Sequence, residues 1–325
     1  MKPLILGLDS GGSKTLVAVA DRHGQVLQLL AGSGLDPLAN PQWQDSLEQL
    51  LSPLHPQLHD LQAAVLGLPL HGEIDRYSRL QQHVAQRLLP CPARVQNDVR
   101  IAFDGALVNR PGVLLLAGTG SMAWASLNGP DAEHIRIGGW GDIFGDEGSA
   151  YWIGREALGW VSRSIDGRAH CPGLTQATLA HLGLGADELL AWCYGLENRR
   201  AGLAALAELV SRLAEHGDPH ATALLASAAV HLADHVSTAW RALGRSGLPT
   251  WSYAGGVFAN RSLLTQVSHH LGCLPSPPRL PPVGGALLRA AQEAGWNPDD
   301  NWVDTLALSL ANNSSGPDAP PPPFT

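Results

Sequence analysis

The chain has no excess of basic residues, no long apolar run and few cysteines. Its 325 residues include 21 lysines and arginines against 29 aspartates and glutamates, a formal net charge of -8. A nucleic-acid backbone binds to clustered positive charge, so this balance excludes nucleic acid as a partner. No segment approaches the roughly 20 apolar residues that a membrane-spanning helix needs, so no membrane association is expected.

The four cysteines are far apart in the sequence and form no C-x-x-C pair. This spacing argues against a zinc ribbon, Fe–S ligation and a small disulfide-bonded scaffold. The first residues also lack the long apolar stretch and small-residue cleavage site of a signal peptide. We therefore expect a reduced, cytoplasmic protein. The cysteines are Cys91, Cys171, Cys193 and Cys273.

What the chain does contain is the composition of a globular protein, with 45% hydrophobic and 15% charged residues. Short apolar runs separated by Gly and Asp predict three strands within residues 4–30. From residue 43 to residue 97, runs with helical spacing alternate with buried strands. Strands that alternate with helices indicate an α/β fold with a mostly parallel sheet.

The second part of the chain repeats the order of the first. A strand, a glycine turn, a strand, a second turn and a third strand follow one another in residues 112–137, as they do in residues 4–30. This repeat predicts two related α/β domains, residues 1–111 and residues 112–295, the second with a helical insertion. The last helix of the second domain is expected to pack back on the first. Residues 312–325 are Pro-rich without apolar periodicity, which predicts a disordered tail.

An acidic residue and a glycine turn follow the first strand, in the sequence LGLDSGGSKT at residues 6–15. Glycines let backbone N–H groups approach an anion closely, and a concave run of such groups forms a phosphate-binding nest. Asp9 at the strand end suits hydrated Mg²⁺, which takes one or two carboxylates together with phosphates. The spacing is not that of a Walker P-loop, because Ser13 stands between Gly12 and Lys14. An ordinary glycine hairpin is the structural alternative.

Two more glycine turns follow apolar strands. In LLLAGTGSMAW, residues 114–124, a strand enters a turn whose amides and two hydroxyls can face an anion. In SYAGGVFAN, residues 252–260, a glycine pair between strand and helix leaves room for a flat nucleobase and its ribose. Each turn alone could serve folding. Two donor-rich turns at equivalent places in duplicated halves indicate a bound phosphate chain.

Asp98 follows a predicted strand and precedes an apolar helix in VQNDVRIAF, residues 95–103. In this place it is either the N-cap of that helix or a carboxylate that faces the bound phosphate. In the second role it would accept the proton of an attacking hydroxyl. Its position alone favours the N-cap.

The segment GGWGDIFGDEGSAYWIGREAL, residues 138–158, combines glycines and several aromatic residues with the acidic residues Asp142, Asp146 and Glu147. Carboxylates beside aromatic faces are a common way to hold a sugar, through hydrogen bonds to hydroxyls and packing against the ring. Glu147 is expected in the first turn of a helix, where the helix dipole favours an acidic residue. Asp146 is therefore the better candidate for a ligand contact.

These segments occur in one order along the chain: LDSGGSKT, QNDVRIAF, LLAGTGS, GGWGDIFGDEGSAYWIGREAL and YAGGVFAN. Together they resemble the N-acetylglucosamine kinase branch of the BadF/BadG/BcrA/BcrD ATPase family, within the sugar kinase/Hsp70/actin superfamily. The resemblance covers about residues 4–295. It implies two duplicated ribonuclease H-like domains of the actin-like ATPase kind, an ATP cleft between them, and closure of the domains on sugar.

The resemblance also implies roles for individual residues, with ATP and Mg²⁺ as cofactors. Asp98 matches the catalytic aspartate, and Asp9 matches the Mg²⁺-associated carboxylate. The residues that match nucleotide binding are Gly11, Gly12, Ser13, Lys14, Thr15, Gly118, Thr119, Gly120, Ser121, Gly255 and Gly256. The residues that match sugar binding are Asn40, Gly139, Trp140, Asp146 and Ala150.

The activity implied is ATP-dependent phosphorylation of an amino sugar at its 6-hydroxyl, with Asp98 as general base. The segment LGLPLHGE, residues 66–73, lacks the serine of characterised acetylglucosamine kinases. Glucosamine, N-acetylglucosamine and N-acetylmuramic acid therefore all remain candidate acceptors. The alternatives are a BadF-type ATPase energiser, whose cluster-binding cysteine context is missing here, and a sugar-responsive binding protein without turnover. Homodimers occur in the family, so a homodimer is an expectation.

His231 and His235 are separated by four residues, as in zinc-binding helices. The glutamate of the H-E-x-x-H motif is replaced by Leu232. The segment lies within a long Ala- and Leu-rich helix. A packed or solvated helix face is therefore the preferred interpretation of this pair.

Overall fold

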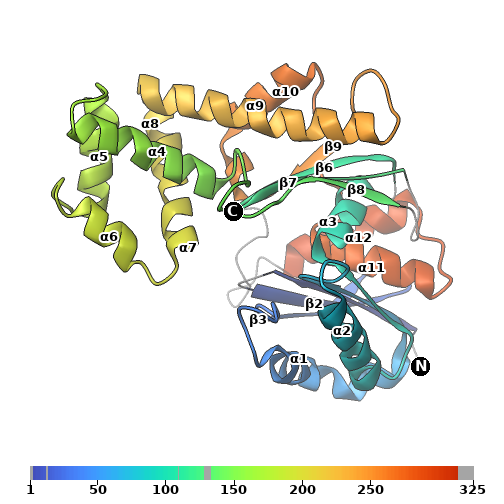
Figure 1. The fold of residues 1–325 in the computed structure, drawn as a ribbon. Coiled ribbons are helices and arrows are strands. Elements are labelled where there is room, and N and C mark those ends of the chain that lie inside the picture. The colour runs from blue at the N-terminus through green and yellow to red at the C-terminus, as the bar shows by residue number, and fades with distance from the viewer. Residues whose placement is uncertain (1–2, 12–13, 109, 128–132, 314–325) are drawn as a thin grey trace.

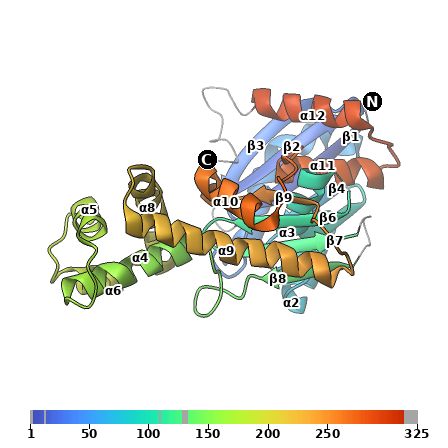
Figure 2. The ribbon, with the colours of Figure 1, turned by 90° about the horizontal axis from the view of Figure 1, so that it is seen from above.

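In a computed structural model, the chain forms two lobes, each built on a β-sheet, and a group of helices projects from one of them (Figures 1 and 2). The structure describes residues 3–11, 14–108, 110–127 and 133–313. The two sheets lie one above the other, with helix α3 (Asp98–Leu107) between them (Figure 1). Within the described ranges, we find no helix with both the length and the apolar character needed to cross a bilayer.

The N-terminal lobe has a mixed sheet of five strands. They are β1 (Leu4–Ser10), β2 (Lys14–Asp21), β3 (Val26–Ser33), β4 (Leu61–Leu68) and β5 (Ala93–Asn97). Their spatial order is β3–β2–β1–β4–β5, and β1, β4 and β5 run parallel. The carboxyl ends of these three strands therefore meet at one edge of the sheet, which is where open α/β sheets bind ligands.

Each face of this sheet has its own apolar core, because successive residues of a strand point to opposite faces. Leu6 and Leu8 of β1 pack on one face with Trp43 and other residues of the first two helices. Ile5 packs on the other face with the last two helices of the chain. The helices of this lobe are α1 (Trp43–Leu51), a 3-10 helix (Ser52–Asp60), α2 (Asp75–Leu88), α3, α11 (Pro282–Glu293) and α12 (Asp300–Asn313).

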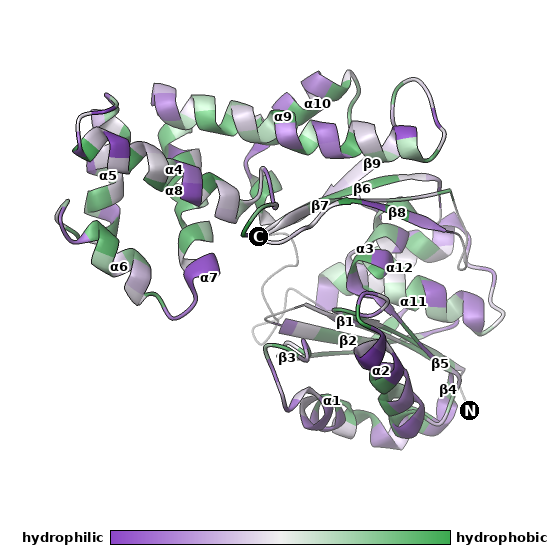
Figure 3. Ribbon diagram, viewed as in Figure 1, coloured by the Kyte–Doolittle hydropathy of each residue, from purple (hydrophilic) through white to green (hydrophobic). Residues whose placement is uncertain are grey.

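The two outer helices of the chain's C-terminal end thus belong to the N-terminal lobe. α11 approaches β1 closely, since a Cβ added at Gly7 would lie 2.7 Å from the backbone nitrogen of Leu287. α11 also packs backbone against backbone on α3, where a Cβ at Gly285 would lie 2.0 Å from the carbonyl oxygen of Ile101. By contrast, α2 is mostly hydrophilic and covers the sheet with a narrow apolar side (Figure 3).

The C-terminal lobe repeats the sheet arrangement with four strands. They are β6 (Gly112–Ala117), β7 (Ser121–Ser126), β8 (His134–Gly138) and β9 (Trp251–Ala254). Their order is β8–β7–β6–β9, in which β6 pairs antiparallel with β7 and parallel with β9. This is the order of the N-terminal sheet without its fifth strand, so the two lobes are related halves.

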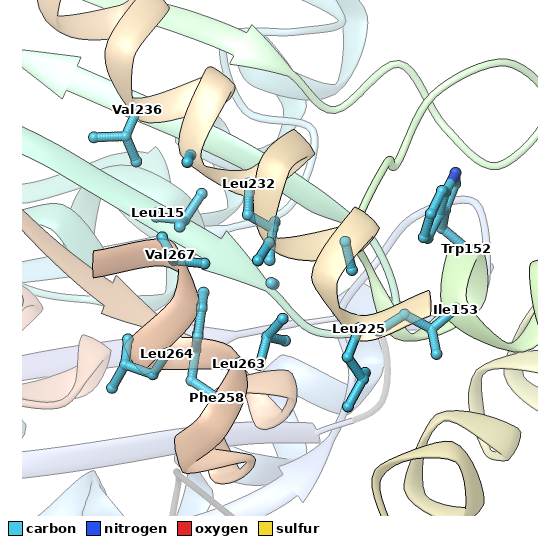
Figure 4. Packing of buried hydrophobic residues seen from close by; sticks show 14 of the residues in the cluster. Leu115, Trp152, Ile153, Leu225, Leu232, Val236, Phe258, Leu263, Leu264 and Val267 are labelled. Carbon is cyan, nitrogen blue, oxygen red and sulfur yellow. The ribbon is translucent and has the colours of Figure 1, made fainter. Parts of the chain in front are cut away.

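Two long helices cover the outer face of this sheet, α9 (Pro219–Ala242) and α10 (Arg261–Leu271). Figure 4 shows their shared core, in which Leu232 and Val236 of α9 and Val267 of α10 surround Leu115 of β6. The core continues through Phe258, which lies in a 3-10 turn (Gly256–Ala259).

Five helices form the projection that extends from the C-terminal lobe, away from both sheets (Figures 1 and 2). They are α4 (Ala150–Ile165), α5 (Pro172–Leu182), α6 (Leu189–Gly195), α7 (Arg199–Ala204) and α8 (Leu206–Glu215). A small core of its own holds the outer part together, with Val161, Cys171, Leu174 and Leu189 buried in it.

α3 joins the two lobes because apolar residues cover both of its sides. Phe103 and Leu107 pack against Leu114 of β6 and Trp124 of β7. Ile101 packs into the core of the N-terminal lobe. α3 therefore begins at the edge of the N-terminal sheet and packs against the C-terminal sheet along its other side.

A buried ionic network also fixes α3. The Asp104 carboxylate is fully buried and accepts hydrogen bonds from Arg100 Nε at 3.1 Å and from Arg289 Nη2 of α11 at 2.6 Å. Removing one member of such a network leaves a buried charge uncompensated, which costs about 3–5 kcal/mol. The network thus holds α11 in one position against α3.

The strands and helices predicted for residues 4–97 and 112–137 are confirmed within a few residues. Patterns in the sequence do not predict α5, α6 or α12. α7 and α8 are separate helices that meet at Ala205. α12 ends at Asn313, two residues inside the predicted tail, and residues 314–325 lie outside the described residues.

Candidate active site

The parallel strands bring Asp9 and Asp98 to the same edge of the N-terminal sheet. Asp9 of β1 lies opposite Gly67 of β4, and the next residue of β4 lies opposite Asn97, after which α3 begins at Asp98. A Cβ at Gly67 would lie 2.2 Å from the side chain of Ile101 and 3.4 Å from the Cα of Asp98. The missing side chain therefore lets the first turn of α3 pack against β4, next to Asp9.

Asn97, and not Asp98, is the N-cap of α3. The Asn97 side chain accepts a hydrogen bond from the backbone of Val99 at 3.0 Å, which is the capping interaction. Asp98 is the first helical residue, and its Oδ1 also accepts from the Val99 nitrogen, at 2.9 Å. The capping role that the sequence favoured for Asp98 is therefore wrong, since its neighbour performs it.

The Asp98 carboxyl group has an unusually high proton affinity. Burial, together with the negative charges of Glu73 and Asp36, raises its pKa to about 6, against the lowering effect of the Val99 N–H. Glu73 lies in the loop after β4, and Asp36 lies in the loop after β3. Carboxylates from three separate segments thus converge at the edge of the sheet. A carboxyl group with a pKa near neutrality is typical of a catalytic acid or base.

The pKa of the Asp9 carboxyl group is raised as well. Burial is the larger cause and the neighbouring Asp98 the next, and together they raise the pKa of Asp9 to about 7, while the Lys14 ammonium opposes this. Among the described residues no side chain or backbone N–H donates a hydrogen bond to the Asp9 carboxylate. Two close carboxylates with raised pKa values form a site that a cation would stabilise.

The first glycine turn connects β1 to β2. Gly11 has no atom within 4 Å of the place where a Cβ would stand, so the space beside it is open. Thr15 is fully buried, and its hydroxyl donates to the Ser33 carbonyl oxygen at 2.7 Å and pairs with the Ser10 hydroxyl at 2.8 Å. Thr15 thus stabilises the hairpin instead of facing the turn. Gly12 and Ser13 lie outside the described residues.

The second glycine turn connects β6 to β7 at the equivalent place in the other lobe. Gly118 again has open space beside it, and Thr119 is exposed. The Ser121 hydroxyl donates a hydrogen bond to the carbonyl oxygen of Glu147 at 2.7 Å, so its proton is directed at the protein and not at the open space beside the turn. The backbone amide of Ala150 donates to the Gly118 carbonyl oxygen at 2.9 Å, so α4 begins directly against this turn.

Asp146 supports this second turn. Its backbone is in the left-handed region, with φ +57°, and its side chain is only 2% exposed. One carboxylate oxygen accepts from the Ser121 nitrogen at 3.3 Å, and the other forms an ion pair with Arg200 of α7. A Cβ at Gly120 would lie 2.5 Å from the Arg200 guanidinium, so a side chain there would displace the end of this arginine. Asp146 therefore ties the turn to the helical projection in this conformation.

Glu147 does not lie in the first turn of a helix, contrary to the expectation from sequence. Ser149 caps α4, which begins at Ala150, so Glu147 precedes the helix by three residues. Its carboxylate lies 3.8 Å from Nε2 of His235, a largely buried residue of α9. The His235 ring also lies where a Cβ of Gly138 would be, at 2.5 Å. His235 thus packs beneath the glycine-rich segment.

The two glycines of the third turn, Gly255 and Gly256, have different surroundings. Gly255 has φ +108°, and a Cβ would lie 2.2 Å from the carbonyl oxygen of Ala117, so the fold itself requires this glycine. Gly256 instead lines a cavity of about 420 Å³ together with Ala150 and Ile153 of α4 and residues of α8. Ala150 therefore lines this cavity.

The remaining predicted residues lie in loops. Asn40 holds its own loop together, with Nδ2 donating to the Gly34 carbonyl oxygen at 3.0 Å and Oδ1 accepting from the Gln42 nitrogen at 3.0 Å. Gly139, with φ +70°, accepts a hydrogen bond from the Arg136 guanidinium. Trp140 is 72% exposed, and Ile143 and Phe144 beside it are exposed as well.

Sequence analysis missed several residues of this site. Asp36 and Glu73 influence Asp98, and Arg200 binds Asp146 from a distant helix. Arg136 forms an ion pair of 3.2 Å with Glu73 across the two lobes. Single charged residues in loops form no pattern, so the only available signal was their position directly after predicted strands. Among the described residues, His231 and His235 belong to no group of three or more potential metal ligands.

Comparison with known proteins places this geometry in context. The model of the BadF/BadG/BcrA/BcrD ATPase family matches residues 6–290. The N-acetylmuramic acid/N-acetylglucosamine kinase of Clostridium acetobutylicum is 27% identical over 268 residues, which cover 80% of this chain and 87% of the relative. The N-acetyl-D-glucosamine kinase of Dictyostelium discoideum is 25% identical over 287 residues, which cover 82% and 89%.

A similar crystal structure is that of a proposed N-acetylglucosamine kinase from Chromobacterium violaceum. It superimposes with a TM-score of 0.70 at 25% identity, covering 88% of this chain and 98% of the other. This similarity confirms the predicted fold class, two duplicated ribonuclease H-like domains of the actin-like kind.

Proposed function

Because the chain belongs to the BadF/BadG/BcrA/BcrD ATPase family, we propose that it is a kinase that transfers the terminal phosphate of ATP to an amino sugar. The acceptor is N-acetylglucosamine or glucosamine, and the phosphate goes to its 6-hydroxyl. The observation that carries this proposal is the position of Asp98, a carboxylate with a raised pKa at the edge where β1, β4 and β5 end. The glycine turns of both lobes open at the corresponding ends of β1 and β6.

Asp98 acts as the general base in this proposal. Its carboxylate accepts a hydrogen bond from the sugar hydroxyl, orients the oxygen towards the phosphorus and takes the proton late in the transfer. A pKa of about 6 leaves the group mostly ionised at neutral pH while keeping it basic enough to accept a proton. The transferred phosphoryl group carries charge on its equatorial oxygens, which the amides of the two turns stabilise.

Asp9 is the residue that would hold Mg²⁺. The fit rests on the Asp9 carboxylate, which is buried beside Asp98 and receives no hydrogen bond from the described residues. Mg²⁺ keeps several waters and takes one or two carboxylates, so one buried aspartate at a strand end suits it. When bound, the ion would neutralise charge on the phosphates of ATP. Lys14 contributes a second positive charge beside the same carboxylate.

The cavity of about 420 Å³ beside Gly256 would hold the adenosine part of ATP. Its walls are mostly small and apolar, with Ala150 and Ile153 on one side and Val257 on the other. Asn260 also lines it and is only 8% exposed, with its Oδ1 fixed as the cap of α10 and its Nδ2 without a partner among the described residues. A flat base with ring-nitrogen acceptors fits such a slot.

N-acetylmuramic acid is a second candidate acceptor. It is supported by the relative from Clostridium acetobutylicum, which is described as acting on both N-acetylmuramic acid and N-acetylglucosamine. The loop after β4, where characterised acetylglucosamine kinases carry a serine, has Leu70 in a strained conformation, with φ +65°. This loop lies next to Asp98 through Glu73, so it is a place where acceptor choice is expected to be set.

A coupled ADP-release assay tests the proposal. The purified chain is given ATP and Mg²⁺ with glucosamine, N-acetylglucosamine, N-acetylmuramic acid or glucose, and the phosphorylated product is identified by mass spectrometry. We expect an amino sugar to give the highest kcat/KM. Asp98→Asn should lower kcat by about 10²–10⁴-fold, while the exposed control Asp45→Asn should stay within twofold. Turnover of Asp98→Asn near that of the parent chain would reject Asp98 as the base.

A further inference from the structure

A second cavity, of about 620 Å³, lies between the two lobes and has no role in the function proposed above. The N-terminal lobe contributes the loop of residues 71–73 and residues 94–97 of β5. The C-terminal lobe contributes Trp124 of β7 and His134 and Arg136 of β8. Because both lobes form its walls, a ligand in this cavity contacts both lobes at once.

Arginine side chains from both lobes line the cavity. Arg94 is paired with Glu293 at 2.8 Å and Arg100 with the buried Asp104 at 3.1 Å, whereas Arg136 is paired with Glu73, the acidic residue of the lining itself. The Arg136 guanidinium is ordered by its ion pair with Glu73 at 3.2 Å. Burial, and then the positive charges of Arg100 and Arg136, lower the pKa of the His134 ring, which lies in the same lining. Such a surface is suited to an anion.

Two wall residues carry buried polar atoms that lack a partner. Gln96 is 8% exposed and Trp124 is 4% exposed. Neither Oε1 of Gln96 nor Nε1 of Trp124 forms a hydrogen bond with any of the described residues. The Trp124 ring is stacked on His134 at 3.9 Å between centroids, which fixes the direction of its N–H. One free donor and one free acceptor match the hydroxyl and amide groups of a sugar.

The cavity is a direct neighbour of the proposed catalytic base. Asn97 lines it, precedes Asp98 in the chain, and donates from Nδ2 to Oε1 of Glu73 at 3.2 Å. Glu73 in turn lines the cavity and acts electrostatically on Asp98. A molecule in the cavity therefore lies beside the acceptor sugar or forms part of it.

We propose that this interlobe cavity binds the anionic group of a small sugar, with Arg136 as its counter-charge and Trp124 and Gln96 as hydrogen-bond partners. The inference rests on the proposed kinase function for its choice of sugar. The anionic group has two possible sources with the same chemistry. One is the lactyl carboxylate of an N-acetylmuramic acid acceptor, and the other is the phosphate of a separate sugar phosphate.

Kinetic measurements test the first source. We compare the parent chain with Arg136→Gln and Trp124→Phe, which removes one N–H and keeps the aromatic ring. If the acceptor's carboxylate occupies the cavity, Arg136→Gln raises KM for N-acetylmuramic acid about tenfold or more, because a charge-assisted bond is lost. Because Arg136 also pairs with Glu73, the KM for N-acetylglucosamine is measured in the same variant, and the ratio of the two KM values should rise about tenfold or more. Arg87→Gln is the matched control, a half-exposed arginine paired with Glu48 at 3.4 Å outside this cavity.

Calorimetry tests the second source without requiring turnover. N-acetylglucosamine 6-phosphate is titrated into the full chain saturated with N-acetylglucosamine, so that binding at the acceptor position is blocked. If a separate sugar phosphate occupies the cavity, Arg136→Gln weakens its binding about tenfold or more, and Trp124→Phe weakens it several-fold.

The proposal is overturned if both variants leave both readouts within twofold of the parent chain. Trp124→Phe keeps the Glu73–Arg136 ion pair, so it decides the matter if Arg136→Gln does not fold. A parent chain that phosphorylates no amino sugar would reject the proposed function alone. The calorimetric result would still decide whether the cavity binds a sugar phosphate.

Discussion

At the residue scale, the position and the pKa of the Asp98 carboxylate depend on neighbouring residues more than on its place in the sequence. Asn97 takes over the capping of α3 and leaves the Asp98 carboxylate at the cleft edge. Burial is the main cause that raises its pKa, and the negative charges of Glu73 and Asp36 raise it further. The group thus meets the two requirements of a general base, a fixed position and a proton affinity near the working pH.

The first prediction concerns the pH dependence of the reaction. A general base must be ionised, so kcat/KM should rise with pH and level off above a midpoint near 6, where Asp98 titrates. Glu73→Gln removes a negative charge that favours the protonated form, so the midpoint should move to lower pH by about 0.5 unit. Glu48→Gln, an exposed glutamate of α1, is the control and should leave the profile unchanged. A midpoint that moves upward in Glu73→Gln would contradict this account.

The second prediction concerns stability. The pKa of Asp98 is raised in the folded state above the roughly 3.9 of an unfolded aspartate, so the fold binds the proton more tightly. Stability is therefore highest below pH 4 as far as this group is concerned, and it decreases as the pH rises through about 6. Asp98→Asn should then increase the free energy of unfolding at pH 7.5 by about 1–2 kcal/mol. Urea unfolding at pH 4.5 and 7.5 checks this, and a loss of stability at pH 7.5 would refute it.

At the element scale, α3 connects the chemistry to both lobes. Its first turn carries Asp98, its middle contributes Asp104 to the buried network with α11, and Phe103 packs under the other sheet. The helix is thereby fixed at three points along its length. Its close contact with α11 depends on Gly285, which leaves no room for a side chain.

The third prediction tests this helix contact. Gly285→Ala places a methyl group within 2.0 Å of the Ile101 carbonyl oxygen, so α11 must move away from α3. We expect a loss of about 1–3 kcal/mol in unfolding free energy, measured by urea denaturation. Gly159→Ala is the matched control inside α4, with no atom within 4 Å of the added Cβ. That control should be neutral or stabilise by about 0.5–1 kcal/mol. Equal effects of the two substitutions would reject the close-contact argument.

Elements with a strong local pattern could be predicted from the sequence. The strands at the start of each lobe are short apolar runs that end at Gly or Asp, and α9 has helical spacing over many residues. α5 and α6 could not be predicted in this way, since each has little of the apolar periodicity that marks a helix on a large core. The boundary at Ala205 between α7 and α8 has no signal in the sequence, and neither does the ion pair of Arg200 with Asp146.

Some features of the candidate site could also be predicted from the sequence, and others could not. The glycine turns and Asp9 and Asp98 lie directly after strands, so their position follows from the parallel sheet. The capping residue could not be decided, because Asn97 and Asp98 are both good N-caps. Arg136 and Arg200 come from distant segments and contact the site only through the assembled fold.

At the scale of the whole molecule, the two lobes meet through α3, through the Glu73–Arg136 ion pair and along the cavity beside it. In the segment that precedes α4, Trp140, Ile143 and Phe144 are largely exposed. An apolar loop of this kind is stabilised when it is covered. Closure of the lobes on substrates would cover it and exclude water from the transfer.

The fourth prediction follows from this arrangement. Adding N-acetylglucosamine together with a non-hydrolysable ATP analogue should reduce the radius of gyration measured by small-angle X-ray scattering, because the lobes approach each other. Either ligand alone should give a smaller change. Trp140→Ala should raise KM for the sugar about tenfold, since burial of the indole on closure is lost. A radius that does not change with both ligands would speak against closure.

The central claim is that a phosphate chain lies between two equivalent turns, one from each lobe, beside the Asp98 carboxylate. A crystal structure with a non-hydrolysable ATP analogue and N-acetylglucosamine measures this directly. We expect the terminal phosphate between residues 11–14 and 118–120, and the sugar 6-hydroxyl about 2.6–3.2 Å from the Asp98 carboxylate. A nucleotide bound away from both turns, or a 6-hydroxyl directed at another group, would contradict the account.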